Sequence, residues 1–370
     1  MIYPEPLKKG DRVAIISLSS GMLGESWCAH QIELGIRRLR EFELEPVFTK
    51  YALSGIAEIW THPDLRAVDL KAAFLDNSIR GIICAIGGID TFRTFPYLME
   101  DAEFISAVRE HPKFFLGFSD TTNNHLMLYR LGLQTFYGQC FICDLAELSE
   151  QMLRYSKSQF ASCFTSYHGR KITPAPFWYE ERTDFSAAAV GTEPVAHPEQ
   201  HGYELLQGNS QFRGELLGGC IESLGEMLLS DRAVYQVDKL KSAGVPDTEI
   251  FREQGEISRR YNIFPSAEEW KGKILFAETS EENPEPDRLR QILEALKAVG
   301  VFANINGILI GKPQNEQYYE EYKSVWCETI GDPLLPILYN INFGHAAPRA
   351  ILPYGALVQV DANRQEILFL

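Results

Sequence analysis

The chain has 370 residues, of which 45% are hydrophobic and 23% charged, and its formal net charge is −15 from 35 Lys and Arg against 50 Asp and Glu. A chain of this length is expected to form two domains, and its acidic balance excludes a general binder of nucleic-acid polymers, which needs clustered cations. No apolar run approaches the roughly 18 residues of a membrane span, and the first ten residues lack the layout of a secretory signal.

The cysteines and histidines do not form a convincing metal motif. Seven cysteines scattered through the chain indicate reduced thiols and a cytoplasmic location. Cys140 and Cys143 have zinc or redox spacing, but no second pair follows, so we expect packing and loop roles. His197 and His201 are four residues apart, yet Pro198 favours a loop over a zinc-binding helix. We therefore expect no metal and no cofactor.

The first half of the chain alternates apolar runs with segments of helical spacing. Such runs are typical of strands buried on both faces, and the alternation predicts a parallel sheet with functional loops at the strand ends. Ser19, the Gly87–Gly88 pair and Ser119 all follow predicted strands. The predicted strands are 12–18, 46–49, 81–86 and 113–117, and the predicted helices are 25–42, 65–75 and a segment that ends at residue 130.

Ser119 lies between a predicted strand and a predicted helix, in the order Gly-Phe-Ser-Asp-Thr. A serine on such a turn has an exposed hydroxyl close to helix N–H groups that can stabilise an oxyanion. The nucleophile elbow is Gly-x-Ser-x-Gly, and Thr121 replaces its second glycine. Asp120 or Thr121 can equally be an ordinary helix N-cap, so this stretch alone leaves both interpretations open.

The organisation changes after about residue 165. Residues 171–191 mix prolines, aromatic rings and charges, which indicates a linker at 166–190 with an exposed aromatic cluster. Residues 214–224 predict a strand, a Gly-Gly turn and the start of a helix, and the charge-rich segment 231–270 indicates a mostly helical insertion.

The C-terminal half is predicted to be a smaller, mixed α/β domain rich in strands. Its predicted strands are 273–278, 307–311 and 336–340, its helices are 286–299 and 316–328, and a closing hairpin spans 351–360 and 366–370. We therefore expect an N-terminal α/β nucleophile domain at 1–165 and a C-terminal domain at 191–370.

Catalysis by Ser119 requires a base, and an imidazole base requires an acid that orients it. Among eight histidines, His345 lies in a glycine-flanked turn directly after a predicted strand, and Glu278 ends a strand in the same half. A serine from one domain and an acid–base pair from the other predict an active site in the interdomain cleft. His125 is a rival base, but it lies six residues after Ser119 on another face of the helix. We interpret it as a core or surface histidine.

Ordered motifs span nearly the whole chain: LKKGDRVAII near the start, AIGGIDTFRTFPYL at 85–98, GFSDTTNNHLMLYRLGLQTFYGQ at 117–139, LLGGCIESL at 216–224, KILFAETSEENP at 273–284, NFGHAAP at 342–348 and LPYGALVQVDANRQEILFL at the end. Through these motifs the chain resembles the serine peptidases that group murein L,D-carboxypeptidases with microcin C immunity proteins. The resemblance implies a catalytic triad of Ser119, Glu278 and His345, an oxyanion hole from the backbone N–H groups of Gly88 and Asp120, and a homodimer.

Three short segments, at 86–88, 135–138 and 278–280, resemble the microcin-immunity branch more closely. That branch hydrolyses the amide between a peptidyl aspartate and a nucleotide, whereas the murein branch removes the terminal D-alanine of tetrapeptides.

The resemblance also implies substrate-binding residues. Gly87 is one candidate, Trp178 is the nearest candidate for stacking on adenine, and Cys220 stands where the family's Gly-Gly-Asn motif has asparagine. Gln139 replaces a usual proline, and segment 231–270 is longer than in family members.

A non-catalytic module is the alternative of a different class. The Gly87–Gly88 loop and the strand-end serines can cradle a phosphate, although Gly-x-Gly-x-x-Gly and Walker patterns are absent. The sequence predicts first a serine hydrolase that cleaves an amide bond in a small peptide or peptidyl-nucleotide. A murein tetrapeptide carboxypeptidase and the nucleotide- or phosphate-binding module are the alternatives.

Overall fold

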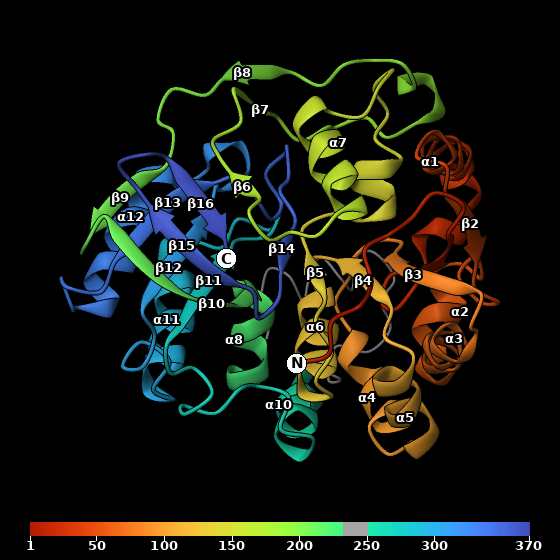
Figure 1. Ribbon diagram of the computed structural model, residues 1–370, viewed down its shortest axis with the longest axis horizontal. Coiled ribbons are helices and arrows are strands. Elements are labelled where there is room, and N and C mark those ends of the chain that lie inside the picture. Colours follow the sequence, from red (N-terminus) through yellow and green to blue (C-terminus); the bar gives the residue numbers. More distant parts are fainter. Residues whose placement is uncertain (232–250) are drawn as a thin grey trace.

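Two β-sheets form the framework of the protein, for which a computed structural model describes residues 1–231 and 251–370 (Figure 1). The first sheet contains, in spatial order, β14 (Leu352–Pro353), β5 (Phe136–Tyr137), β4 (Phe114–Gly117), β3 (Ile79–Cys84), β1 (Arg12–Ile16) and β2 (Glu45–Phe48). All of these strands are parallel except β14, which pairs antiparallel with β5.

The second sheet is mixed. Its strands are, in spatial order, β6 (Lys171–Ile172), β16 (Glu366–Phe369), β15 (Leu357–Asp361), β10 (Gln211–Cys220), β11 (Lys273–Glu278), β12 (Gly307–Gly311), β13 (Ile337–Ile341) and β9 (Glu204–Gln207). The central strands β10 to β13 are parallel, and antiparallel strands flank them on both sides. The predicted combination of a parallel N-terminal sheet with a β-rich mixed C-terminal unit is confirmed.

The helices lie around and between the sheets, and α6 contacts α8 at the centre of the molecule (Figure 1). Their bounds are α1 (Ala29–Glu41), α2 (Ile56–Thr61), α3 (Pro63–Leu75), α4 (Phe95–Leu98), α5 (Ala102–Glu110), α6 (Thr121–Arg130), α7 (Arg154–Ala161), α8 (Ile221–Leu229), α10 (Phe251–Arg260), α11 (Pro286–Ala298) and α12 (Tyr319–Ile330). In the part of the chain that the structure describes, no helix is long and apolar enough to cross a membrane.

The segment predicted to be a linker contains strands, and the segment predicted to be a mostly helical insertion contains a helix in its described part. Segment 166–190 contains β6 and also β7 (Phe177–Tyr179), which pairs with β8 (Ala196–Pro198) in a two-stranded ribbon. Within segment 231–270, helix α10 is present, and residues 232–250 lie outside the described residues.

The predicted Gly-Gly turn at Gly218–Gly219 is wrong. Strand β10 continues through both glycines, which pair with Phe276 and Ala277 of β11. A Cβ at Gly218 would lie 1.8 Å from the carbonyl oxygen of Phe276, so the two glycines permit close packing of the strands and do not form a turn. The prediction of one continuous strand at 351–360 is also wrong. This segment contains two strands, β14, which joins the first sheet, and β15, which joins the second.

One hydrophobic core connects the two sheets. The apolar residues of β1, β3 and β4 are buried on both faces, as the continuous apolar runs predicted. Across the boundary, the ring of Tyr137 lies 5.3 Å from the ring of Phe276, which in turn lies 5.3 Å from the ring of Tyr354. The shared core fixes the positions of the ends of β3, β4 and β11 relative to one another. The candidate site lies at these strand ends.

Candidate active site

Ser119 occupies a strained turn between β4 and α6. Its φ angle is +65°, a left-handed conformation that serine rarely adopts. The hydroxyl of Tyr137 accepts a hydrogen bond from the Ser119 N–H at 3.2 Å. A strained serine between a strand and a helix is the arrangement of the nucleophile elbow, formed here with Thr121 in place of the second glycine.

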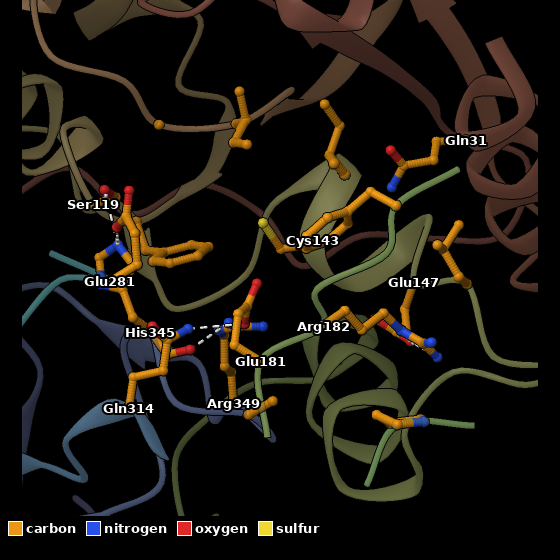
Figure 2. A pocket seen from close by; sticks show the side chains of 18 of the residues that line it. Gln31, Ser119, Cys143, Glu147, Glu181, Arg182, Glu281, Gln314, His345 and Arg349 are labelled. Carbon is orange, nitrogen blue, oxygen red and sulfur yellow. Dashed lines mark hydrogen bonds and ion pairs between the residues drawn. The ribbon is translucent and has the colours of Figure 1, made fainter. Parts of the chain in front are cut away.

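His345 lies beside Ser119, as Figure 2 shows, and its other ring nitrogen contacts Glu278. Its Nε2 lies 3.0 Å from Ser119 Oγ, and its Nδ1 lies 2.7 Å from Glu278 Oε2. The Tyr137 hydroxyl donates to the other carboxylate oxygen of Glu278 at 2.5 Å. The hydroxyl, imidazole and carboxylate are thus aligned so that a proton can pass from the serine to the histidine while the acid orients the ring.

The charges around His345 favour its protonated form. Burial lowers the pKa of His345, but Glu278 and then Glu281 stabilise the imidazolium more strongly, so the pKa is raised well above its usual value. Burial, and next the charge of Glu278, raise the pKa of Tyr137. Tyr137 therefore remains a neutral phenol that can donate to the carboxylate.

The turn that carries His345 is held tightly against Glu278. Gly344 has a φ of +88°, and a Cβ on it would lie 2.3 Å from Glu278 Cγ. Any other residue at this position would therefore push the turn and the Glu278 side chain apart. Arg349 donates from Nε to the Gly344 carbonyl and from Nη2 to the His345 carbonyl, both at 2.6 Å, and it pairs with Asp144 at 3.2 Å. These contacts fix the position of the imidazole.

The loop of Gly87 and Gly88, which follows β3, lies directly over the Ser119 turn. A Cβ built on Gly87 would be 2.7 Å from Ser119 Cβ, 2.9 Å from Ser119 Oγ and 3.3 Å from the backbone nitrogen of Asp120. The loop backbone and the Asp120 N–H therefore flank the hydroxyl, where the oxyanion of an attacked carbonyl group would form.

A buried polar network joins the ends of β1, β3 and β4. Ser19 Oγ donates to Asp120 Oδ2 at 2.6 Å and accepts from the N–H groups of Ile89 at 2.9 Å and Asp90 at 3.1 Å. Both terminal nitrogens of Arg66 donate to Asp90, at 2.9 and 3.0 Å. The network holds the glycine loop against the serine turn, and it explains why these strand ends converge.

Replacing Gly87 with alanine is expected to lower kcat by about 100-fold, because the added methyl group would push the loop away from Ser119 and the oxyanion position. Steady-state kinetics of amide hydrolysis checks this. Gly169→Ala is the control for an added methyl group: Gly169 has a φ of +80°, but no atom lies within 4 Å of the new carbon, so kcat should not change. A Gly87→Ala enzyme with kcat within twofold of the native value would contradict the expectation.

Ser119 opens into a pocket of about 530 Å³ (Figure 2). Beside His345 its wall is polar and includes Glu181, Glu281, Gln314 and Arg349, whereas Gln31 and the ion pair of Glu147 with Arg182 lie at the opposite end (Figure 2). The lining also contains the apolar and aromatic side chains of Met22, Trp27, Ile86, Phe118, Ile142, Leu148, Leu153, Tyr179, Phe185 and Pro194.

Two half-exposed aromatic residues belong to the end of the pocket that is distant from Ser119. Trp27 is 49% exposed and Phe185 is 44% exposed. Trp27 lies in the short 3-10 helix Ser26–Cys28 that directly precedes α1, and the Phe185 carbonyl oxygen lies 3.1 Å from His30 Nε2 in α1, so both residues lie near the start of the helix that carries Gln31. This end offers flat apolar surfaces to a ligand that reaches it from Ser119.

Trp178 and Cys220, predicted as substrate-binding residues, are not among the described residues that line this pocket. The ring of Trp178 stacks on His197 at 4.3 Å, and Lys312 Nζ lies 5.1 Å from its centre. Cys220 is buried, donates its N–H to Thr122 Oγ1 at 2.9 Å and pairs with Glu278 between β10 and β11.

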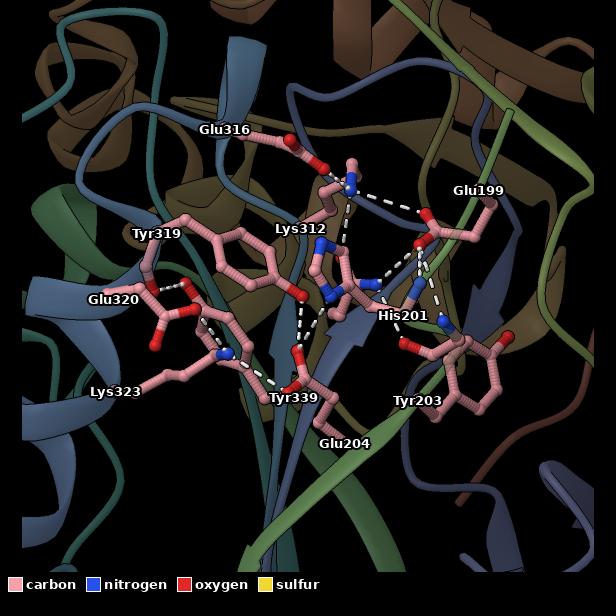
Figure 3. A network of polar contacts seen from close by, with 12 residues as sticks. Glu199, His201, Tyr203, Glu204, Lys312, Glu316, Tyr319, Glu320, Lys323 and Tyr339 are labelled. Carbon is pink, nitrogen blue, oxygen red and sulfur yellow. Dashed lines mark hydrogen bonds and ion pairs between the residues drawn. The ribbon is translucent and has the colours of Figure 1, made fainter. Parts of the chain in front are cut away.

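Lys312, which lies over the Trp178 ring, is part of a network of polar contacts (Figure 3). Lys312 is almost fully buried, and its Nζ contacts Glu199 at 3.2 Å, Glu316 at 2.6 Å and Asn340 at 3.1 Å. Glu199 directly follows β8, so the network fastens the β7–β8 ribbon to the ends of β12 and β13. The neighbouring Tyr179, and not Trp178, lines the pocket.

His125, His197 and the cysteines lie outside the Ser119–His345–Glu278 line. His125 is fully buried, with Nε2 3.0 Å from the Gly117 carbonyl and Nδ1 2.7 Å from Thr135 Oγ1, and burial lowers its pKa to about 3. It is a core histidine. His197 pairs with Glu180 at 2.7 Å, and all seven cysteines are free thiols. In residues 1–231 and 251–370, no cluster of three or more His, Cys, Asp or Glu side chains could hold a metal ion.

Four residues of the site were not singled out from the sequence. Tyr137 and Glu281 lie inside segments that carried the family resemblance, but nothing in those segments indicated a contact with Glu278 or His345. Glu181 and Arg349 had no sequence signal, because Glu181 contacts Gln314 and Arg349 contacts Asp144, residues that are far apart in the chain.

The fold and the site define a serine-peptidase-type enzyme, and known proteins agree. Models of the LD-carboxypeptidase N-terminal and C-terminal domains match residues 13–138 and 213–360. The chain is 25% identical over 359 residues to a probable murein peptide carboxypeptidase of Bacillus subtilis, covering 95% of this chain and 89% of that protein.

Solved structures show the same relationship. An MccF-like protein from Streptococcus pneumoniae, crystallised in complex with AMP, is 45% identical with a TM-score of 0.89, covering 97% of this chain and 98% of that chain. The microcin self immunity protein MccF, in complex with aspartyl sulfamoyl adenosine, shares the fold at 20% identity with a TM-score of 0.75, covering 100% of this chain and 98% of that chain. The protein belongs to the LD-carboxypeptidase family of serine peptidases.

Proposed function

We propose that the protein is a serine hydrolase that cleaves the amide bond of aminoacyl- or peptidyl-nucleotide conjugates. The observation that carries this proposal is the continuous line from Ser119 through His345 to Glu278, at one end of a pocket whose other end is lined by Trp27 and Phe185.

The reaction follows from this geometry. His345 Nε2 accepts the Ser119 proton while Oγ attacks the amide carbonyl, and Glu278 holds the opposite ring nitrogen. The N–H groups of Gly88 and Asp120 stabilise the oxyanion. His345 then donates its proton to the leaving nitrogen, which leaves an acyl-enzyme on Ser119. Water, deprotonated by His345, hydrolyses the acyl-enzyme and restores the serine.

The aromatic side chains at the end of the pocket distant from Ser119 support a nucleotide as part of the substrate. A purine has flat faces that stack on aromatic side chains, and Trp27 and Phe185 are both half-exposed there. The 45% identical MccF-like protein was crystallised with AMP, which supports the same ligand class for this chain.

Trp27→Ala and Phe185→Ala are each expected to raise KM for aspartyl sulfamoyl adenosine by about tenfold, because loss of base stacking costs about 1–3 kcal/mol. The control is Phe177→Ala, which removes another exposed ring that does not line the pocket and should leave KM unchanged. Trp178→Ala tests the residue expected from the sequence: a rise in KM for this variant alone would place the base on Trp178.

A murein tetrapeptide carboxypeptidase is the second candidate, and the Bacillus subtilis relative favours it. Release of D-alanine from a murein tetrapeptide, measured beside hydrolysis of aspartyl sulfamoyl adenosine, decides between the substrates. Faster D-alanine release would replace the nucleotide proposal. Stoichiometric labelling of Ser119 by a fluorophosphonate supports either enzyme, whereas an unlabelled protein that binds nucleotide would be a phosphate-binding module.

The homodimer implied by the family resemblance is also a proposal. Light scattering coupled to size-exclusion chromatography should give a mass close to twice the 41.9 kDa of the chain.

A further inference from the structure

A second carboxylate, that of Glu281, contacts Nε2 of His345, the ring nitrogen that faces Ser119. Glu281 Oε2 is 3.0 Å from His345 Nε2, the same atom that lies 3.0 Å from Ser119 Oγ. Figure 2 shows Glu281 beside Ser119 and His345. A protonated Nε2 has a single hydrogen to donate, so a histidine that is paired with Glu281 cannot accept the Ser119 proton at the same time.

The backbone before Glu281 is held in place, while its side chain is 55% exposed toward the pocket. Ser280 donates from its N–H at 2.8 Å and from its hydroxyl at 2.6 Å to Glu222, and Glu222 is buried in α8. Glu281 therefore stays close to His345, yet its carboxylate can rotate without moving the backbone.

Carboxylates dominate the surroundings of His345. Glu278 faces it from β11, Glu281 from the following turn, Glu181 from the loop after β7, and Glu222 acts on it from α8. Arg349 is the cation of the described pocket wall that lies near His345, and it already pairs with Asp144 and donates to the carbonyl groups of Gly344 and His345.

Glu181 adds to this negative character. Its carboxylate accepts from Gln314 Nε2 at 2.8 Å. Loss of hydration inside the pocket raises the pKa of Glu181, and the charges of Arg349 and His345 oppose this rise. The pocket wall next to Ser119 thus presents two carboxylates, Glu181 and Glu281, to the acyl part of a substrate. This wall suits a cationic group.

We propose that Glu281 binds a free ammonium group on the acyl part of the substrate and, when no substrate is present, holds His345 in an ion pair. As the ammonium draws the carboxylate away, the imidazolium loses its second acidic partner and releases its proton to solvent. The neutral Nε2 is then available to Ser119. This inference rests on the proposed function, since it requires Ser119 and His345 to be the reacting pair.

The first test compares alanyl sulfamoyl adenosine with its N-acetyl derivative. The native enzyme should prefer the free amine by about 10- to 100-fold in kcat/KM, the range of one charge-assisted hydrogen bond, and Glu281→Gln should remove this preference. Glu282→Gln, which makes the same charge change at a neighbouring residue outside the pocket lining, should retain it.

The second readout is the pH dependence of kcat/KM with the N-acetyl substrate. Activity requires neutral His345 and therefore falls on the acidic side. Glu281→Gln removes one carboxylate that stabilises the imidazolium, so the acidic limb should move to lower pH. Glu278, Glu181 and Glu222 remain in the variant and still stabilise the imidazolium, whereas the positive charge of Arg349 opposes them, so the shift should be partial.

A third comparison identifies the source of the ammonium. It measures kcat/KM for N-acetyl-lysyl and N-acetyl-norleucyl sulfamoyl adenosine. If the native enzyme prefers the lysyl substrate and Glu281→Gln does not, the bound cation belongs to the side chain and not to the α-amine. The proposal is overturned if Glu281→Gln keeps the native preferences for amines and the native acidic limb. Failure of the proposed function is recognised separately, because Ser119→Ala would then remain active.

Discussion

Ser119→Ala is expected to lower kcat for amide hydrolysis by about 10⁴- to 10⁶-fold, the range observed when serine hydrolases lose their nucleophile. The alanine keeps the turn but removes the oxygen that lies 3.0 Å from His345 Nε2. Because the pocket walls are unchanged, the dissociation constant for AMP should stay within about threefold of the native value, and labelling by a fluorophosphonate should disappear.

Ser106→Ala is the control for this experiment. It removes a hydroxyl from the exposed part of α5, where Ser106 donates to Glu110, and it should be fully active. If Ser119→Ala retained more than a tenth of the native kcat, the serine mechanism would be wrong and another route to amide hydrolysis would have to replace it.

Glu278→Gln is expected to lower kcat by about 10³- to 10⁴-fold. The carboxylate accepts from Nδ1 and the backbone N–H of His345 and from the Tyr137 hydroxyl. An amide has one acceptor oxygen and carries no charge, so it can neither satisfy all three donors nor stabilise the imidazolium. Loss of the corresponding acid in a serine protease costs about 10⁴-fold.

The pH profile of the Glu278→Gln enzyme gives a second readout. Glu278 raises the pKa of His345, so its neutralisation should move the acidic limb of the residual kcat/KM to lower pH. Tyr137→Phe is the control, because it removes one hydrogen bond to Glu278 and no charge; we expect a loss of about tenfold in kcat and no shift of the limb to lower pH. An unshifted limb in Glu278→Gln would show that this carboxylate does not act on the reacting imidazole.

Several features of the fold could be predicted because their causes are local. Continuous apolar runs such as 12–18 predicted strands that are buried on both faces, and serine or glycine after such runs marked the sheet edge. The same local logic failed at Gly218–Gly219, where a pair that usually forms a turn instead allows β10 to pack closely on β11.

The aromatic residues show a second limit of prediction from the sequence. The sequence identifies Trp178 as an aromatic residue in a polar, proline-rich segment, but it contains no information on which ring faces the pocket. Lys312 and His197 hold Trp178 in the β7–β8 ribbon, whereas Trp27 and Phe185, from segments about 160 residues apart, line the pocket.

The sequence alone determined the α/β class, the family, and the candidate residues Ser119, Glu278 and His345, because strand ends, glycine turns and ordered motifs are local properties. Only the tertiary structure decided that these three side chains lie within hydrogen-bonding distance, that Tyr137 completes the environment of Glu278, and that Glu281 lies on the reacting nitrogen. Such distances depend on how two sheets pack through a shared core, and packing couples residues that are more than 100 positions apart in the chain.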